Sequence, residues 1–450
     1  MAGKVTREEL LQKSKKPGED ALKLHAFYRG KMQTVPRCCI RDFNDFAIWY
    51  SPGVAEPCKM IRKNRELVYD YTNKWNTVAI VSDGSRVLGL GDICPEAGLP
   101  VMEGKALLFK YLGGVDAVPI CLDTKDPDEI INAVKWLQPS FGGINLEDIS
   151  NPKCFYILDR LRAEARIPVW HDDQQGTAAV TVAGMINALK IVGKKKEDIK
   201  MTMIGIGAAN VAILRLLFKF GVKPGNTIVV DSKETLHTGR ADLENDRKRN
   251  PYKWDICEKT NSEKRKGGIA EALKGADVCI SLSKSGPGII LPEWINGMAK
   301  DSIVFACANP IPEIWPWDAK EAGARVVATG RSDFPNQVNN SVGFPAIFRG
   351  ALDVRARTIT DEMCLTAAYE LAKFAEDRGI DEDNIAATMD EWEVFVREAV
   401  AVGMKAQEQG VAGLTVSREE LKKNAESMIK SARSMVELLM KEKIIPLPPV

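Results

Sequence analysis

Residues 201–210 have the sequence MTMIGIGAAN, and the rest of the chain can be organised around this stretch. An apolar run leads into Gly205 and Gly207, and the residues that follow, ANVAILRLLFKFG, have helical periodicity. A strand, a glycine turn and a helix in this order direct backbone N–H groups and a helix N-terminus at a pyrophosphate. Asn210 stands where a third glycine is common, and its larger side chain requires only slightly looser packing of the helix on the strand. The stretch predicts a dinucleotide-binding turn.

The residues beyond the turn indicate which dinucleotide is bound. About 24 residues after Gly207, TIVVD ends in Asp231, where an acid binds ribose hydroxyls and favours NAD by repelling a 2′-phosphate. Ser232 and Lys233 follow, and a hydrogen bond to a charged group is worth about 1.5–3 kcal/mol. Three more cations stand at 247–249, unless these are only solvated surface. We expect both NADP and NAD to serve, with a slight preference for NADP to which Lys233 contributes.

Apolar strands alternate with helical stretches on both sides of this turn. Strands are predicted at 77–83, 117–123, 142–148 and 167–173, and then at 201–207, 227–231, 276–283, 302–310 and 324–330. The first fifty residues and the chain beyond about 360 are predicted to be mostly helical. The polar, charge-rich stretch 237–268 interrupts the second series and is predicted to be an insertion over the surface. This alternation predicts an α/β fold with parallel sheets. We expect an N-terminal α/β domain with a helical start at 1–174. A Rossmann-like doubly wound NAD(P) domain with a helical C-terminus is expected at 175–450.

Composition excludes several classes of protein. The chain has 450 residues, 45% hydrophobic and 27% charged, which fits a globular protein of two or more domains. The net charge of +1 favours neither nucleic acid nor an acidic membrane as a partner. Ten scattered cysteines without a C-x-x-C spacing, a polar N-terminus and the lack of a long apolar run predict a reduced, cytoplasmic protein.

Two pairs of acids follow predicted strands directly. INLEDI, residues 144–149, contains Glu147 and Asp148, and IPVWHDDQ, residues 167–174, contains Asp172 and Asp173. Such acids are most often caps or salt-bridge partners, but these follow apolar runs at strand ends, where α/β sheets bind ligands. Oxygen ligands without cysteine or clustered histidine indicate Mg²⁺ or Mn²⁺. His171 is expected to orient the acids, with direct ligation as the alternative.

Two further residues are candidates for proton transfer. Tyr50 precedes a Pro-Gly turn in YSPGVAEPC, and Lys105 lies in PVMEGKALLF, at the predicted start of a helix. Either residue alone is most often structural. A lysine among apolar neighbours, near a helix N-terminus and a cation, would have a lowered pKa and would suit a base.

Taken together, these stretches resemble the malic enzymes. The likeness covers about residues 35–355 and has the length of the short microbial-type form. It is carried, in the family's order, by YSPGVAEPC, SDGSRVLGLGDI, PVMEGKA, FGGINLEDI, PVWHDDQQGTAA, GIGAAN, FACANPIPE and NQVNNSVGFPAIFRGALD. Cys94 in GDIC replaces a common glycine, and Gln175 stands where short forms often have histidine. Neither departure threatens activity.

The resemblance implies a role for each candidate residue. The metal ligands would be Glu147, Asp148 and Asp173. Tyr50 would be the general acid and Lys105 the general base, with Asp172 beside the metal. Arg86 and Asn340 would contact substrate, and Asn309 would contact both substrate and nicotinamide.

The implied reaction is the metal-dependent oxidative decarboxylation of (S)-malate to pyruvate and CO₂, with reduction of NAD(P)⁺, in a homodimer. A malolactic-type enzyme that retains NAD and releases lactate is the alternative within the fold. A non-catalytic dinucleotide sensor would be expected to lack Tyr50, Lys105 or a metal acid, and all are present. Amino-acid dehydrogenases share the two-domain plan but have no reason to carry both acid pairs.

Overall fold

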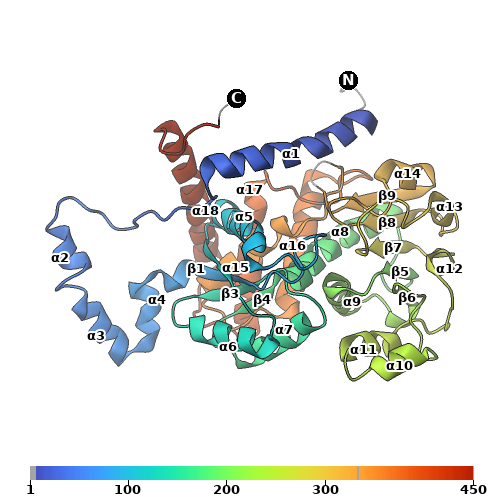
Figure 1. The fold of residues 1–450 in the computed structure, drawn as a ribbon, viewed down its shortest axis with the longest axis horizontal. Helices are drawn as coiled ribbons and strands as arrows, with labels where there is room; N and C mark the ends of the chain where they lie inside the picture. The colour runs from blue at the N-terminus through green and yellow to red at the C-terminus, as the bar shows by residue number, and fades with distance from the viewer. Residues whose placement is uncertain (1–6, 332–333, 449–450) are drawn as a thin grey trace.

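The computed structural model describes residues 7–331 and 334–448, with side chains from residue 16 onward. Two parallel sheets form its centre (Figure 1). The first has the order β2-β1-β3-β4. Its strands are β1 (Thr77–Ser82), β2 (Asp116–Cys121), β3 (Gly143–Leu146) and β4 (Val169–His171). Each coincides with a predicted strand, and the α/β class is confirmed.

The second sheet has the order β6-β5-β7-β8-β9, and all its pairings are parallel. Its strands are β5 (Met201–Ile204), β6 (Thr227–Val230), β7 (Val278–Ser281), β8 (Ser302–Ala306) and β9 (Ala324–Thr329). The chain leaves β5 toward one side for β6 and then crosses to β7 on the other. Ligands of doubly wound sheets bind at such a switch point, at the carboxyl ends of the strands.

Helices connect the strands and cover the sheets. Around the first sheet they are α5 (Pro95–Gly113), α6 (Pro127–Leu137) and α7 (Lys153–Glu164). Around the second they are α9 (Ala208–Phe220), α12 (Ile269–Leu273), α13 (Pro292–Ile295) and α14 (Pro316–Glu321). The charged stretch 237–268, expected as a surface insertion, contains the short helices α10 (Ala241–Asp246) and α11 (Pro251–Lys259). No helix within the described ranges is long and apolar enough to cross a membrane.

A buried helix, α8 (Thr177–Val192), links the two sheets. Most of its residues are buried, and it packs against α9 and α16 (Asp361–Arg378). A Cβ added at Gly184 would lie 3.3 Å from the Phe305 ring of β8, so the helix lies directly on the second sheet. A π-helical turn, Asp172–Gly176, joins α8 to β4. This turn holds two of the four acids, so a rigid element positions them.

The remaining C-terminal helices return to the first sheet. They are α15 (Phe344–Asp353), α17 (Trp392–Glu408) and α18 (Arg418–Lys441). Both α15 and α18 pack on α5, and the ring of Phe109 in α5 makes edge contacts with Phe344 and Phe348. These contacts hold the two halves together. The domain boundary between residues 174 and 175 stays a prediction.

The N-terminal segment forms an extended arm. Helix α1 (Arg7–Tyr28) ends at Tyr28, whose hydroxyl donates to the Pro446 carbonyl at 2.9 Å, and α4 (Val68–Tyr71) precedes β1. Between them, α2 (Asp45–Trp49) and α3 (Ala55–Lys63) stretch away from the body of the molecule, in blue in Figure 1. Large apolar side chains of the arm are exposed, among them Phe43, Ile48, Trp49 and Tyr50. Large exposed apolar patches usually mark an interaction surface.

Candidate active site

The two acid pairs meet at the carboxyl ends of β3 and β4. These strands are parallel neighbours, with Leu146 opposite His171, so the residues that follow them lie side by side. One carboxylate oxygen from each of Glu147, Asp148 and Asp173 lies within 4.8 Å of the others. The three residues proposed as metal ligands therefore lie together, and Glu147 and Asp148 are almost completely buried.

The surroundings of Asp148 test whether a cation fits. Its backbone has φ 55°, a left-handed conformation that aspartate tolerates better than most residues. Its N–H donates to Asp173 Oδ2 at 2.8 Å, while its own buried Oδ2 has no hydrogen-bond partner within the described ranges. Burial, together with the charge of Asp173, raises the pKa of Asp148 to about 8. Burial also raises the pKa of Glu147. An unpartnered oxygen among crowded acids is the donor set that suits a hard divalent cation.

Lys105 lies beside these acids. Its Nζ is 2.6 Å from Asp172 Oδ2 and 2.9 Å from Glu147 Oε1, and it stands over the ring of Phe344. The expected position at a helix start is wrong, because α5 begins at Pro95 and Lys105 lies in its third turn. The lowered pKa was expected for a lysine beside a bound cation, and it stays a prediction. Burial disfavours the charged amine, but the carboxylates of Asp172 and Glu147 outweigh it and raise the pKa of Lys105.

Asp172 joins the two halves of the site. It is fully buried and accepts hydrogen bonds from Lys105, from Trp170 Nε1 at 3.3 Å and from Asn340 Nδ2. Asn340 begins a short 3₁₀ helix after β9 and so belongs to the second half of the chain. A Cβ at Gly176 would lie 2.0 Å from Asp172 Oδ1, so this position needs glycine. The structure places Asn340 at the site, as expected.

Two expected substrate residues lie on adjoining loops. The N–H of Arg86 donates to the carbonyl of Asp148 at 2.9 Å, and its exposed guanidinium donates to the Leu88 carbonyl at 3.3 Å. Asn309 follows β8 and is exposed, and its carbonyl would lie 2.8 Å from a Cβ at Gly89. The loop at 86–91 therefore contacts both the acid cluster and the carboxyl end of the second sheet.

Tyr50 lies elsewhere in the single chain. It follows the last residue of α2, on the arm, and its side chain is 73% exposed. Hydrogen bonds of this part of the arm join its own residues, such as Trp49 Nε1 to the Cys39 carbonyl at 3.0 Å. One chain thus does not bring Tyr50 to Lys105 and the acids.

The glycine turn has the predicted geometry. Gly205 has φ 100°, and a Cβ there would lie 2.6 Å from Asn210 Nδ2 and 2.8 Å from the Leu282 carbonyl. Gly207 precedes the first residue of α9, as a pyrophosphate-binding turn requires. Asn210 is fully buried and donates to the carbonyls of Ile204 and Leu282 at 3.3 and 3.1 Å. It ties the turn to the end of β7, so its contribution is to hold the turn in place.

Replacing Gly205 with alanine is expected to weaken dinucleotide binding by about tenfold or more. The added Cβ would clash with the Leu282 carbonyl, so the turn must shift away from the position that presents its N–H groups to the pyrophosphate, and a loss of about 1.4 kcal/mol of binding corresponds to tenfold. Titration of NADH against protein fluorescence measures the effect. Gly297→Ala is the control, because its added Cβ has only an ordinary contact, 3.4 Å from the Trp294 carbonyl. Unchanged affinity in Gly205→Ala would show that the turn does not contact the dinucleotide.

Asp231, Ser232 and Lys233 were expected to contact the ribose, but Asp231 and Lys233 are already paired with other residues of the protein. Asp231 directly follows β6, but its side chain is only 4% exposed and is held by Arg240 and Lys253. Lys233 Nζ is paired with Asp242 Oδ2 at 2.8 Å, and Ser232 is exposed. The sequence reasoning missed Arg240 and Lys253 because both lie in the stretch interpreted as a surface insertion.

Glu313 is another residue without a predicted role. It is fully buried in the PIPE part of FACANPIPE and accepts hydrogen bonds from the Ser281 hydroxyl at 2.7 Å and from the N–H groups of Ser283 and Ala308 at 2.8 and 3.0 Å. It therefore joins the carboxyl ends of β7 and β8, next to Asn309. The sequence signal that could have identified Glu313 is the presence of an acid inside an apolar motif.

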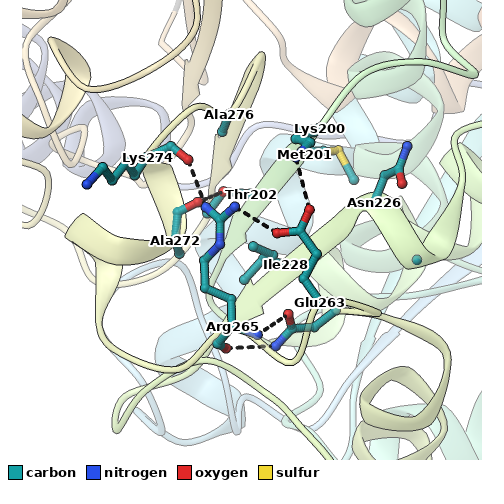
Figure 2. Close-up of a pocket in the computed structure, with 12 residues that line it drawn as sticks. Lys200, Met201, Thr202, Asn226, Ile228, Glu263, Arg265, Ala272, Lys274 and Ala276 are labelled. Atoms are coloured by element: carbon teal, nitrogen blue, oxygen red, sulfur yellow. Dashed lines mark hydrogen bonds and ion pairs between the residues drawn. The ribbon is translucent and has the colours of Figure 1, made fainter.

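A small cavity lies on the opposite edge of the second sheet, at the amino ends of β5 and β6. Figure 2 shows Glu263 between Lys200 and Arg265, with ion pairs of 2.9 Å to each. Its volume of about 20 Å³ suits a single water molecule. Because its charges are paired with one another, this cavity is not a candidate for the substrate or the dinucleotide.

A glycine turn on a doubly wound sheet, with loops that meet a buried cluster of acids and one lysine, defines a dinucleotide-dependent oxidoreductase. The chain matches the family models described as malic enzyme, N-terminal domain, at residues 29–162 and malic enzyme, NAD binding domain, at residues 174–407. It therefore belongs to the malic enzyme family.

Individual relatives agree with this assignment. The chain is 49% identical over 403 residues to a Bacillus subtilis (strain 168) protein named bifunctional malic/malolactic enzyme, covering 90% of this chain and 96% of that one. It is 50% identical over 383 residues to an NAD-dependent malic enzyme of Geobacillus stearothermophilus, covering 85% and 78%. The crystal structure of Entamoeba histolytica malic enzyme superposes with a TM-score of 0.95 and 52% identity, covering 99% of this chain and 93% of that one. Curated relatives are named for NAD in some cases and for NADP in others.

Proposed function

We propose that this protein converts (S)-malate to pyruvate and CO₂ with reduction of NAD(P)⁺, and that it requires Mg²⁺ or Mn²⁺. The observation that carries the proposal is the cluster in which Glu147, Asp148 and Asp173 converge beside the Lys105–Asp172 pair. When bound, the cation would polarise the malate hydroxyl and stabilise negative charge on the substrate, and the dinucleotide would accept hydride.

The chain's own residues handle the protons. Lys105 would be the base for the C2 hydroxyl proton once a bound cation offsets the carboxylates that raise its pKa, and Asp172, 2.6 Å from Nζ, orients the amine. After C2 loses its hydride, the bond between C3 and C4 breaks and C4 leaves as CO₂. Tyr50 then donates its hydroxyl proton to C3 to give pyruvate. Arg86, Asn309 and Asn340 would bind substrate, and Asn309 would also face the nicotinamide.

An assay of malate-dependent reduction tests this function. We expect NAD(P)H and pyruvate to appear in equal amounts when Mn²⁺ is present, and neither to appear in excess chelator. The experiment is run with NAD and with NADP, each with and without Mn²⁺. Malate consumption without any dinucleotide reduction would contradict the proposal.

A malolactic-type reaction is the second candidate. It is favoured by the name of the Bacillus subtilis relative, which includes both activities. In that reaction the hydride returns to the product, so lactate accumulates without net NAD(P)H. Measuring lactate and pyruvate in the same reaction separates the two, and we expect pyruvate to predominate.

We also propose that the enzyme is a homodimer in which each arm supplies Tyr50 to the partner's site. The apolar side chains of the arm are uncovered in one chain, and Phe43 is 91% exposed. Within the described residues, Tyr50 of the same chain lies exposed on the arm and away from the acids and Lys105. A second copy of the chain would both cover the apolar side chains of the arm and receive its tyrosine, because in a two-fold dimer each arm reaches the other subunit in the same way.

The surface that would receive the arm includes the exposed side of α5, the helix that carries Lys105. Leu99 and Leu107 of α5 and Val118 of β2 are exposed apolar residues on the first half of the chain. Strand β2 is the edge of its sheet, which an incoming segment can cover.

All ten cysteines are free, which supports a cytoplasmic location for the dimer.

A further inference from the structure

The acid that follows β6, Asp231, already binds five donors of the protein itself. Both terminal guanidinium nitrogens of Arg240 bind Asp231, Nη1 to Oδ1 at 2.9 Å and Nη2 to Oδ2 at 3.0 Å. Lys253 Nζ adds a contact of 2.6 Å to Oδ2. The N–H groups of Lys233 and Glu234 donate to Oδ1 at 2.9 and 3.1 Å. A carboxylate has about four lone-pair sites, so five donors leave none for ribose hydroxyls.

Arg240 is held in place as firmly as its partner. Its side chain is 4% exposed, and Nε and Nη2 also donate to Asp242 at 3.1 and 2.8 Å. Burial favours the neutral form of Asp231, but hydrogen bonds from Arg240 and Lys253 outweigh it and hold the pKa of Asp231 well below its usual range. The carboxylate therefore stays ionised and paired.

The pairing changes the charge that a cofactor meets. Asp231 alone would present −1 to the ribose, whereas the cluster of three acids (Asp231, Glu234, Asp242) and three cations (Lys233, Arg240, Lys253) sums to zero. An isolated acid at this strand end favours NAD in two ways, by accepting hydrogen bonds from ribose hydroxyls and by repelling a 2′-phosphate. Both effects require a carboxylate that is accessible and not neutralised.

We propose that Arg240, supported by Lys253, sets the cofactor selectivity of this enzyme by occupying Asp231. The acid then neither binds the ribose of NAD nor excludes the 2′-phosphate of NADP. This inference rests on the proposed function only for the identity of the cofactors. Dinucleotide binding can be measured without malate or metal, so the two proposals fail separately.

Under this proposal Lys233 contributes less to the preference for NADP than the sequence predicted. Its side chain is 65% exposed and pairs with Asp242, which Arg240 also binds. Exposed pairs of this kind are weak. The loss of Lys233 is therefore expected to affect NADP binding less than the loss of Arg240, which changes the state of the acid itself.

Arg240→Met tests the proposal, because methionine keeps an unbranched stem and removes the charge. NADH and NADPH are titrated against each variant by fluorescence. Freeing Asp231 is expected to raise the ratio of the NADPH to the NADH dissociation constant by at least about tenfold, the value of one charge-assisted contact. Lys253→Met should change the ratio in the same direction, by less. Lys259→Met is the matched control, since Lys259 lies on the same helix as Lys253 but pairs with Asp255 on the surface.

A second variant decides the matter if Arg240→Met does not fold. Asp231→Asn keeps the shape of the side chain and removes its charge. If the acid is structural, the dissociation constant for NADH should stay within about threefold, because no ribose contact is lost. A tenfold weaker affinity for NADH in Asp231→Asn, or an unchanged ratio in folded Arg240→Met, would overturn the proposal.

Discussion

Replacing Asp173 with asparagine is expected to lower malate turnover by more than about a hundredfold, since outer partners of a metal site alone are worth about 10–100-fold. Asp173 is one of the three acids whose oxygens lie within 4.8 Å of one another. Asparagine has nearly the same shape but lacks the charge that a divalent cation needs. Glu147→Gln is expected to act in the same way, for the same reason.

Two measurements separate loss of metal from loss of fold. Mn²⁺ affinity, measured by titration calorimetry, should fall together with turnover, while the dissociation constant for NADH should change little. Asp123→Asn is the control, because Asp123 also follows a strand of the first sheet but is exposed and outside the cluster. Unchanged Mn²⁺ affinity in Asp173→Asn would show that the acids hold no metal.

Mixing two inactive variants is expected to restore activity. Tyr50→Phe lacks the proposed acid and Lys105→Ala lacks the proposed base, so each homodimer should be nearly inactive in malate oxidation to pyruvate. If Tyr50 acts in the partner's site, a mixed dimer has one site with both residues and one with neither. Random exchange of equal amounts makes half of the dimers mixed, so we expect about a quarter of wild-type activity.

Co-expression with two different affinity tags isolates the mixed dimer. If Tyr50 served its own chain, every site of the mixed dimer would lack one residue, and its activity would stay as low as that of the parents. As a check on the role of the tyrosine, Tyr50→Phe alone should reduce oxaloacetate better than it forms pyruvate. An equal loss in both reactions would mean that the tyrosine is not the acid.

Much of this fold was predictable because its signals are local. Each predicted strand is a short apolar run, and buried parallel strands need such runs on both faces. The glycine turn at Gly205 was predictable for the same reason, since strand, turn and helix adjoin in the chain. The acid pairs were predictable as a cluster because the carboxyl ends of neighbouring parallel strands meet at one edge of the sheet.

Other features depend on residues that are distant in sequence. The availability of Asp231 depends on Arg240 and Lys253, which reach it from a stretch with no strand or motif signal. The protonation of Lys105 depends on Asp172, 67 residues later, since burial and the acids act in opposite directions on its pKa. Such opposing effects can be weighed only when the distances between the groups are known.

The sequence alone thus determined the fold class, the dinucleotide turn and the cluster of acids, because periodicity and strand-end position are properties of short segments. Only the tertiary structure decided that the acid after β6 is occupied and that Tyr50 stands on an exposed arm away from Lys105. Both outcomes follow from packing between distant segments. The free energy of such packing comes from buried area and paired charges, neither of which a short segment contains.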